Sequence, residues 1–153
     1  MTLTPIPKEL YQQILENMPI CCVDLVIYHQ GKVLLGLRKN EPLKNQWCVP
    51  GGRILKNETL EAAVKRKAKE EVGLDVEIIQ KVGSYEVFFD KGPFPGLKTG
   101  IHDITIVFLV KPKDKNPVIS LENHQSTYQW FDHIDERWHT YVKQVLKDSK
   151  AFQ

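Results

Sequence analysis

A glycine-rich turn followed by an amphipathic helix is the sequence feature that most constrains the fold of this chain. The turn, Pro50-Gly51-Gly52, follows a short apolar run, and glycine lets a backbone bend tightly and come close to another group. Apolar residues then recur every four positions from Leu60 to Val72, which predicts a helix. Asn57 is its expected N-cap and Gly73 its expected C-cap.

The rest of the chain predicts strands and two further helices. The predicted strands are residues 20–28, 33–37, 76–89, 101–110 and 128–131, and the predicted helices are residues 7–18 and 135–146. Strands and helices do not alternate regularly, so a doubly wound parallel sheet is not expected. The order favours an α+β fold with a mixed sheet between helices. A length of 153 residues predicts a single domain over residues 1–153.

Composition excludes several classes of protein. A formal net charge of +2 is too small to indicate a nucleic-acid partner, and no apolar run is long enough to span a bilayer, so no membrane partner is expected. No secretory signal is visible at the start of the chain. Cys21, Cys22 and Cys48 lack C-x-x-C spacing and are typical of reduced thiols. We therefore expect a cytoplasmic protein.

Two adjacent acids end the predicted central helix. Lys67, Glu70 and Glu71 stand at positions i, i+3 and i+4, so they share one face. Acids at a helix C-terminus oppose the helix dipole and cost stability. Carboxylates beside the free carbonyls of a glycine turn would instead form an all-oxygen site, which suits Mg²⁺ or Mn²⁺. A solvated acidic helix end is the alternative interpretation.

The segment 52–74 resembles the box of the Nudix hydrolase family, G-x5-E-x7-R-E-U-x-E-E-x-G-U, where U is apolar. The matching residues are Gly52, Glu58, Arg66, Ala68, Glu70, Glu71, Gly73 and Leu74. The resemblance extends over about residues 24–131 and implies the Nudix α/β/α sandwich. It also implies a divalent cation and hydrolysis of a small-molecule nucleotide, a nucleoside diphosphate linked to another moiety. Glu58 and Arg66 lie two helical turns apart, and we expect them to brace the loop and helix.

Lys67 departs from the box, because the family has a Glu at this position. A protonated lysine neither binds a metal nor accepts a proton. One interpretation is a degenerate, non-catalytic nucleotide-binding module. A second candidate function, a MutT-like pyrophosphohydrolase of nucleoside triphosphates or of ADP-ribose-type conjugates, stays open, although Lys67 argues mildly against it. The third is the GDP-mannose mannosyl hydrolase subgroup, which this chain also resembles and which lacks the same Glu. That resemblance implies water attack at the anomeric carbon of a nucleotide sugar, and a homodimer.

The subgroup resemblance implies a set of metal ligands and a base. The carbonyl of Gly51 and the carboxylate of Glu71, with Glu70 beside it, are the expected ligands, joined by a Gln that lies beyond the box. The subgroup has its catalytic His directly after that Gln, whereas this chain has His124 before Gln125. Either residue is therefore a candidate ligand, and His124 is the predicted general base. The alternative is that His124 only packs against a neighbouring tryptophan.

Residue chemistry adds candidates for substrate binding. Arg38 and Arg53 suit bidentate bonds to a diphosphate, and we expect both to assist catalysis. Asp24 interrupts an apolar strand, which is costly unless the carboxylate is paired with substrate or with an arginine. His102 and Asp103 follow a long loop and are candidates to contact the sugar. An ordinary role as polar residues at a loop end explains them equally well.

Overall fold

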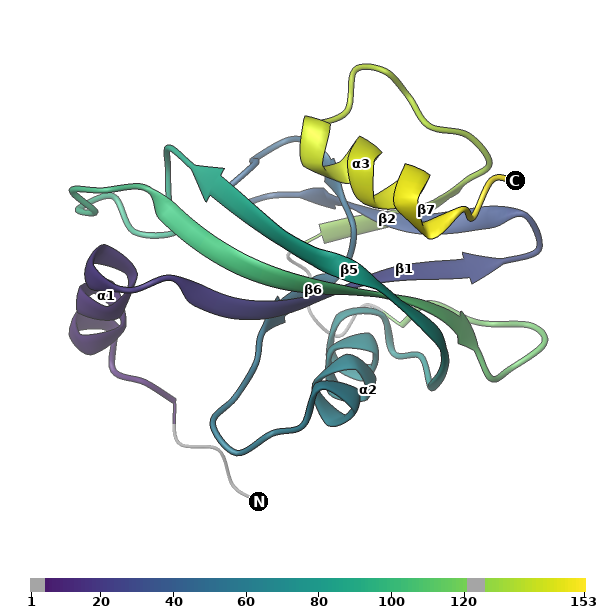
Figure 1. Ribbon diagram of the computed structural model, residues 1–153, viewed down its shortest axis with the longest axis horizontal. Coiled ribbons are helices and arrows are strands. Elements are labelled where there is room, and N and C mark those ends of the chain that lie inside the picture. Colours follow the sequence, from purple (N-terminus) through teal and green to yellow (C-terminus); the bar gives the residue numbers. More distant parts are fainter. Residues whose placement is uncertain (1–4, 121–125) are drawn as a thin grey trace.

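A seven-stranded mixed sheet with helices on both faces forms the centre of the molecule (Figure 1). The computed structural model describes residues 5–120 and 126–153. In chain order the elements are α1 (Lys8–Asn17), β1 (Ile20–His29), β2 (Lys32–Arg38), β3 (Trp47–Cys48), β4 (Gly51–Arg53), α2 (Leu60–Val72), β5 (Val76–Phe89), β6 (Ile101–Pro112), β7 (Ser126–Phe131) and α3 (Thr140–Ser149).

The strand order β3-β2-β1-β6-β5 makes β1 central, with β4 pairing to β1 and β7 to β2. β1 and β6 are parallel, from Ile20 opposite Asp103 to Ile27 opposite Val110. The other pairs are antiparallel. The predicted mixed sheet is therefore confirmed. Because β4 follows the glycine turn and lies on β1, the turn is placed directly against the middle of the sheet.

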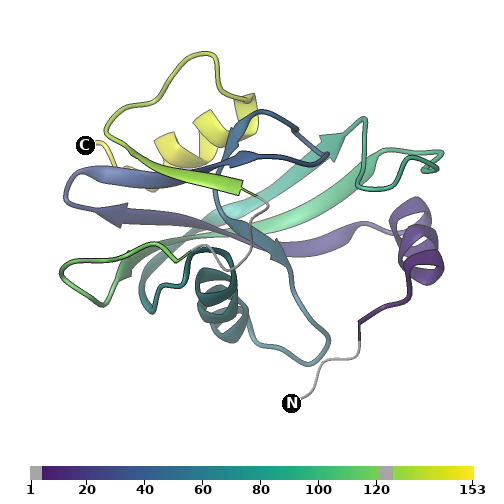
Figure 2. The same ribbon diagram turned by 180° about the vertical axis from the view of Figure 1, so that it is seen from behind.

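Side chains along β1 point alternately to the two faces of the sheet, and each face packs against a helix. Val23 and Leu25 belong to the core cluster that includes Ala68 of α2. Val26 belongs to the cluster that includes Val145 of α3. Successive strand residues point to opposite faces, and both faces are covered, so the strand is apolar almost throughout. Figures 1 and 2 show α2 and α3 on opposite sides of the strands, which confirms the α+β sandwich.

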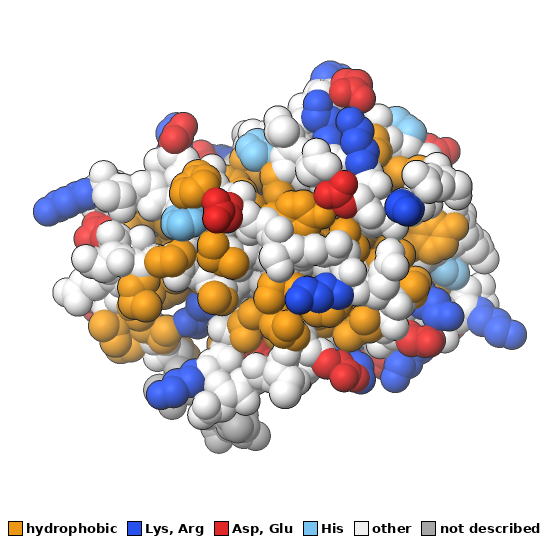
Figure 3. Space-filling view, in the orientation of Figure 1, with side chains coloured by type: hydrophobic (Ala, Val, Ile, Leu, Met, Phe, Trp, Pro, Cys, Tyr) orange, Lys and Arg blue, Asp and Glu red, His pale blue; other side chains and the backbone are white. Residues whose placement is uncertain are grey.

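Helix α1 lies at one end of the sheet, away from α2 and α3 (Figure 1). Its Leu15 is buried with Ile20 and Ile101 in a third apolar cluster. Met18 and Phe88 remain exposed at this end, where hydrophobic side chains gather on the surface shown in Figure 3. α1 therefore closes one end of the sheet with little burial of its own. No helix of the described chain is long and apolar enough to cross a membrane.

The predicted N-cap of the central helix is wrong by two residues. Thr59 is the N-cap of α2, and its hydroxyl oxygen accepts a hydrogen bond from the Ala62 amide at 3.1 Å. Asn57 instead takes a left-handed backbone conformation with φ of +67°. Asn tolerates that conformation well, so the same residue type suits a turn as well as a cap. The C-cap is confirmed, because Gly73 has φ of +71°.

The start of the last helix also differs from the prediction, whereas β5 has the irregularity that the sequence predicts. The last helix begins at Thr140 rather than at Asp135, because Asp135 accepts a backbone hydrogen bond from Trp138 in a preceding turn. The expected irregularity at Gly83 is present as a shift in the β5–β6 register between residues 81 and 83, with a second shift between residues 78 and 80. Neither change moves the strands that surround the glycine turn.

Candidate active site

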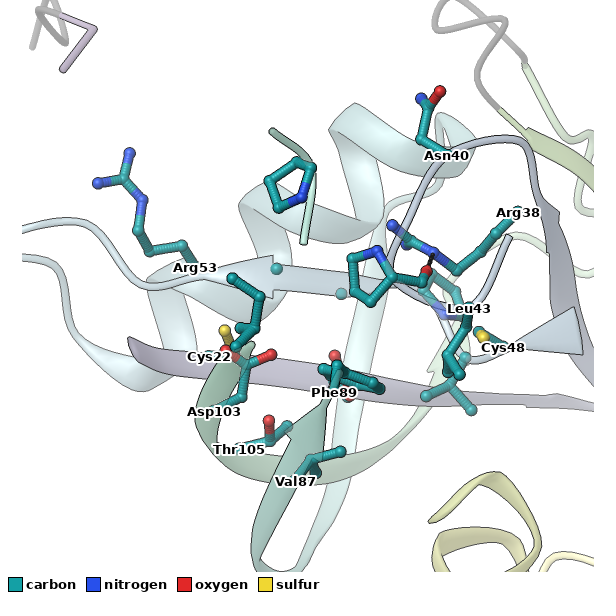
Figure 4. Close-up of a pocket in the computed structure, with 18 of the residues that line it drawn as sticks. Cys22, Arg38, Asn40, Leu43, Cys48, Arg53, Val87, Phe89, Asp103 and Thr105 are labelled. Atoms are coloured by element: carbon teal, nitrogen blue, oxygen red, sulfur yellow. Dashed lines mark hydrogen bonds between the residues drawn. The ribbon is translucent and has the colours of Figure 1, made fainter. Parts of the chain in front are cut away.

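A cavity of about 460 Å³ lies where the glycine turn meets the central strands (Figure 4). This volume is within the roughly 300–1,000 Å³ range of small-molecule sites. Its lining includes six of the predicted site residues, namely Asp24, Arg38, Gly51, Arg53, Glu71 and Asp103. They come from β1, β2, β4, α2 and β6, so the fold collects residues that lie far apart in the sequence.

The glycine turn passes close to two charged side chains. A Cβ atom on Gly51 would overlap the carboxylate of Asp24 and the carbonyl of Val23. A Cβ atom on Gly52 would lie 2.8 Å from Cε and 3.0 Å from Nζ of Lys67. Gly51 therefore needs glycine because a carboxylate and the backbone of β1 come close, whereas the atoms nearest Gly52 belong to the movable end of the Lys67 side chain. The backbone of the turn is held between Asp24 on β1 and Lys67 on α2.

The expected brace between Glu58 and Arg66 is confirmed. The Arg66 guanidinium donates to both carboxylate oxygens of Glu58, from Nε at 2.6 Å and from Nη2 at 3.0 Å. Nη2 also donates to the carbonyl of Arg53 at 3.0 Å, and Glu58 accepts from the Leu55 amide at 3.0 Å. The Arg66 hydrogen bonds hold the pKa of Glu58 below its usual value. This pair therefore fixes β4 and its loop to α2.

The two adjacent acids of α2 face different surroundings. Glu71 lines the cavity, where Oε1 accepts from Lys67 Nζ at 2.7 Å and Oε2 accepts from the Tyr128 hydroxyl at 3.2 Å. The side chain of Glu70 is 49% exposed, does not line the cavity and accepts from Arg66 Nη1 at 3.0 Å. Lys67 also reaches Glu70, at 3.4 Å. The expected shared face is confirmed, but only Glu71 is turned toward the cavity.

The oxygen ligands among the described residues are of the type that a hard cation prefers, but they are too few to complete its coordination. The Glu71 carboxylate and the Gly51 backbone offer oxygen, the ligand that Mg²⁺ prefers. Within residues 5–120 and 126–153, no group of three or more His, Cys, Asp or Glu residues is placed to hold a metal ion. The predicted ligands His124 and Gln125 lie outside the described residues.

Two carboxyl groups in the cavity have pKa values well above the usual range. Burial raises the pKa of Asp24 to about 7, although the hydrogen bond that it accepts from the Tyr141 hydroxyl acts in the opposite direction. Burial also raises the pKa of Asp103 to about 6, although the neighbouring His102 and Arg38 act in the opposite direction. Perturbed carboxyl groups of this kind gather at functional sites, because burial there favours the neutral form.

The two predicted arginines lie on opposite sides of the cavity that they line (Figure 4). Arg38 donates from Nε to the carbonyl of Pro42 at 2.6 Å, and this hydrogen bond positions its guanidinium. Arg53 lies over the ring of Tyr11, with its guanidinium carbon 5.1 Å from the ring centre. This cation–π contact brings α1 into the site.

The predicted pair His102 and Asp103 is divided between two places. Asp103 lines the main cavity, whereas His102 stacks on Phe88 with ring centres 4.3 Å apart and lies at a separate hollow beside α1. Its Nε2 is buried without a described hydrogen-bond partner. Successive residues of a strand point to opposite sides, so the two side chains cannot share one site.

Sequence reasoning missed three tyrosines that line the cavity, Tyr11, Tyr128 and Tyr141. Each sits in an element whose apolar pattern already accounts for an aromatic residue. Their hydroxyl groups and faces become relevant only once α1, β7 and α3 are placed around the glycine turn.

Comparison with known proteins identifies relatives of this chain. A model of the NUDIX domain family matches residues 20–148. The low-salt glycan biosynthesis protein Agl8 of Haloferax volcanii is 40% identical over 143 residues, which is 94% of this chain and 90% of that protein. An ADP-ribose pyrophosphatase of Methanocaldococcus jannaschii is 37% identical over 92 residues, 60% of this chain and 50% of that protein.

Solved structures agree on the fold. A MutT NUDIX hydrolase from Burkholderia pseudomallei superposes with a TM-score of 0.69 at 23% identity, over 86% of this chain and 98% of that one. The NUDIX domain of Shewanella oneidensis NrtR, solved with ADP ribose, gives a TM-score of 0.67 at 19% identity, over 95% and 97%. The family match, the Agl8 similarity and the box on β4 and α2 together show that this chain belongs to the Nudix hydrolase family.

Proposed function

We propose that this protein is a divalent-metal-dependent hydrolase of a nucleotide sugar, such as GDP-mannose, and that water attacks the anomeric carbon. The observation that carries this proposal is the Lys67–Glu71 ion pair in the cavity, at 2.7 Å. Lysine replaces the box Glu that other members use for metal binding or as a base, and an ammonium group can do neither. A reaction that does not need that Glu is therefore favoured.

The similarity to Agl8 supports the substrate class. That relative is named for glycan biosynthesis, and it matches this chain over most of both lengths. Glycans are assembled from sugars activated as nucleotide conjugates. A nucleotide sugar is thus a substrate that a hydrolase involved in glycan biosynthesis would encounter.

The proposed reaction is a displacement with inversion. The oxygen of water forms a bond to the anomeric carbon, while the bond from that carbon to the diphosphate oxygen breaks. The electron pair leaves with the nucleoside diphosphate, and the water proton passes to a general base. The products are a free sugar of inverted configuration and a nucleoside diphosphate.

The lining residues can be assigned to the two halves of such a substrate. Arg38 and Arg53 approach from opposite sides and would bind the diphosphate oxygens with charge-assisted hydrogen bonds. Asp24 and Asp103 would accept or donate hydrogen bonds to sugar hydroxyls. A cation held by Glu71 and the Gly51 backbone would neutralise charge on the leaving diphosphate.

Several expectations from the sequence stay predictions. His124 is the proposed base, with Gln125 beside it as a proposed ligand, although both lie outside the described residues. Glu70 stays a proposed ligand, and its exposed position indicates an outer role. The homodimer and the cytoplasmic location also stay predictions.

A pyrophosphohydrolase is the second candidate function. The similarity to the Methanocaldococcus jannaschii ADP-ribose pyrophosphatase favours it, although this chain spans half of that protein. In such a reaction water attacks phosphorus, and the products are a nucleoside monophosphate and a phosphorylated fragment. The third candidate is a binding module without turnover, which would release no hydrolysis product.

Product analysis separates the three candidates. The protein would be incubated with Mg²⁺ and with GDP-mannose, UDP-glucose, ADP-ribose and dGTP in turn, and the products separated by anion-exchange chromatography. The proposal predicts free sugar and nucleoside diphosphate from a nucleotide sugar. Sugar phosphate with nucleoside monophosphate would favour the second candidate, and binding without any product the third. The Glu71→Gln variant is the control for contaminating hydrolases.

A further inference from the structure

The side chain of Lys67 is enclosed between α2 and the glycine turn. It is 13% exposed, its ammonium lies 2.7 Å from Oε1 of Glu71, and it lines the cavity. Its Cε and Nζ are the nearest atoms to a Cβ placed on Gly52. The ammonium is therefore a positive charge fixed at the wall of the site, where the turn has no side chain to cover it.

The charge of Lys67 reaches the interior of the cavity. Burial raises the pKa of the Asp24 carboxyl and of the Cys22 thiol, and the positive charge of Lys67 opposes burial at both groups. Glu71 would otherwise present an uncompensated negative charge to any phosphate in the cavity. Arg38 and Arg53 line the same cavity, so Lys67 adds a third fixed cation to a surface that already suits an anion.

We propose that Lys67 is a diphosphate-binding residue, whose ammonium contacts phosphate oxygens of the nucleotide directly. This inference rests on the proposed function only for the identity of the substrate, because the same ammonium would contact any nucleoside diphosphate bound in this cavity. The residue that departs from the family box thus has a positive role in binding and is not merely a lost acid.

The test is nucleotide binding without a divalent cation. ADP and GDP would be titrated by calorimetry in the presence of EDTA into the wild type, Lys67→Met, Glu71→Gln and the double variant. A charge-assisted hydrogen bond to phosphate corresponds to a change of about tenfold or more in affinity. We expect Lys67→Met to weaken binding by at least about that factor, and Lys67→Arg to restore most of it.

The double variant separates direct contact from charge compensation. If Lys67 only neutralised Glu71, removal of both charges would return affinity to the wild-type value. Direct contact predicts that the double variant stays as weak as Lys67→Met. Lys69→Met is the matched control, because Lys69 lies on the same helix with a 62% exposed side chain and does not line the cavity. Its affinity should stay within about twofold of the wild type.

Three results would overturn the inference. They are unchanged affinity in Lys67→Met, recovery in the double variant, and a wild type that binds neither nucleotide in EDTA. Thermal unfolding of each variant checks the fold, and Lys67→Gln repeats the comparison with a neutral polar side chain. Lys67-dependent binding by a protein that hydrolyses no nucleotide sugar would remove the proposed function and leave this inference standing.

Discussion

The hydroxyl of Tyr141 at the start of α3 donates a hydrogen bond to Oδ2 of Asp24 in the middle of β1. The two residues are 117 positions apart in the sequence, and both line the cavity. Burial raises the pKa of Asp24 to about 7 although this hydrogen bond opposes the change. The hydrogen bond therefore joins α3 to the Asp24 carboxyl group, whose charge changes near neutral pH.

The first prediction concerns stability and pH at Asp24. In the unfolded chain the carboxyl ionises near its ordinary value of 3.8, whereas in the folded protein it stays neutral up to about 7. The stabilising contribution is thus complete below the unfolded value and is lost as the pH rises toward 7. Relative to Asp24→Asn, the wild-type free energy of unfolding should fall by about 2–3 kcal/mol between about pH 5 and pH 7.5.

Urea unfolding of both proteins at the two pH values measures this difference. Asn keeps a carbonyl oxygen that accepts the Tyr141 hydrogen bond, so the variant removes the titration with little loss of packing. Asp103, whose pKa is also raised by burial, is present in both proteins and largely cancels. An equal stability difference at both pH values would show that Asp24 is not neutral in the folded protein.

The second prediction concerns the brace between Glu58 and Arg66. Their side chains are only 13% and 20% exposed, and the guanidinium also holds the carbonyl of Arg53. Arg66→Met should lower the free energy of unfolding by about 1–3 kcal/mol, because it leaves partly buried acceptors without donors. Lys65→Met is the control: the Lys65–Glu61 pair is exposed, and its loss should cost less than about 1 kcal/mol. Similar losses in both variants would contradict the assigned role.

The third prediction separates the two adjacent acids of α2. Glu71→Gln should abolish turnover and leave the fold intact, because the carboxylate faces the cavity and Gln has nearly the same size. Glu70→Gln should reduce activity less, since this side chain faces solvent. Initial rates at limiting Mg²⁺ measure both effects, with circular dichroism to check folding. Retained activity in Glu71→Gln would remove Glu71 from the site.

The fold could be predicted from local patterns because each helix and central strand buries one or two regular faces. The four-residue repeat from Leu60 to Val72 and the apolar run from Ile20 to Tyr28 correspond to α2 and β1. The sequence does not distinguish Asn57 in a turn from Asn57 at a cap, because turns and caps favour the same small polar residues. The start of α3 differs from the prediction because Asp135 belongs to a preceding turn, in which its carbonyl accepts a hydrogen bond from the Trp138 amide.

The part of the site that could be predicted is the part whose residue positions follow from the Nudix box. Gly51, Arg53 and Glu71 lie within or beside one strand–loop–helix unit, so their mutual positions follow from the box. The partners Tyr128 and Tyr141 come from β7 and α3, and no local pattern links them to that unit. His102 shows the converse, because a residue adjacent to a cavity residue on a strand is turned away from it.

The fourth prediction concerns the general base. If His124 removes the water proton, the rate should rise with pH through a histidine-like pKa and level off above it. His124→Ala should lower kcat by roughly two to four orders of magnitude, the usual contribution of a general base. Steady-state kinetics over a range of pH measure both effects, and His133→Ala on the exposed surface is the control. A variant that keeps the wild-type pH profile would assign the base to another residue.

The position of bond cleavage tests the central claim most directly. Hydrolysis of the preferred nucleotide sugar in ¹⁸O-labelled water, followed by mass spectrometry of both products, identifies the atom that water attacks. Attack at the anomeric carbon predicts that the label is found in the free sugar and that the nucleoside diphosphate carries none. Label in a phosphate product would contradict attack at carbon and would assign this Nudix hydrolase to the pyrophosphohydrolases.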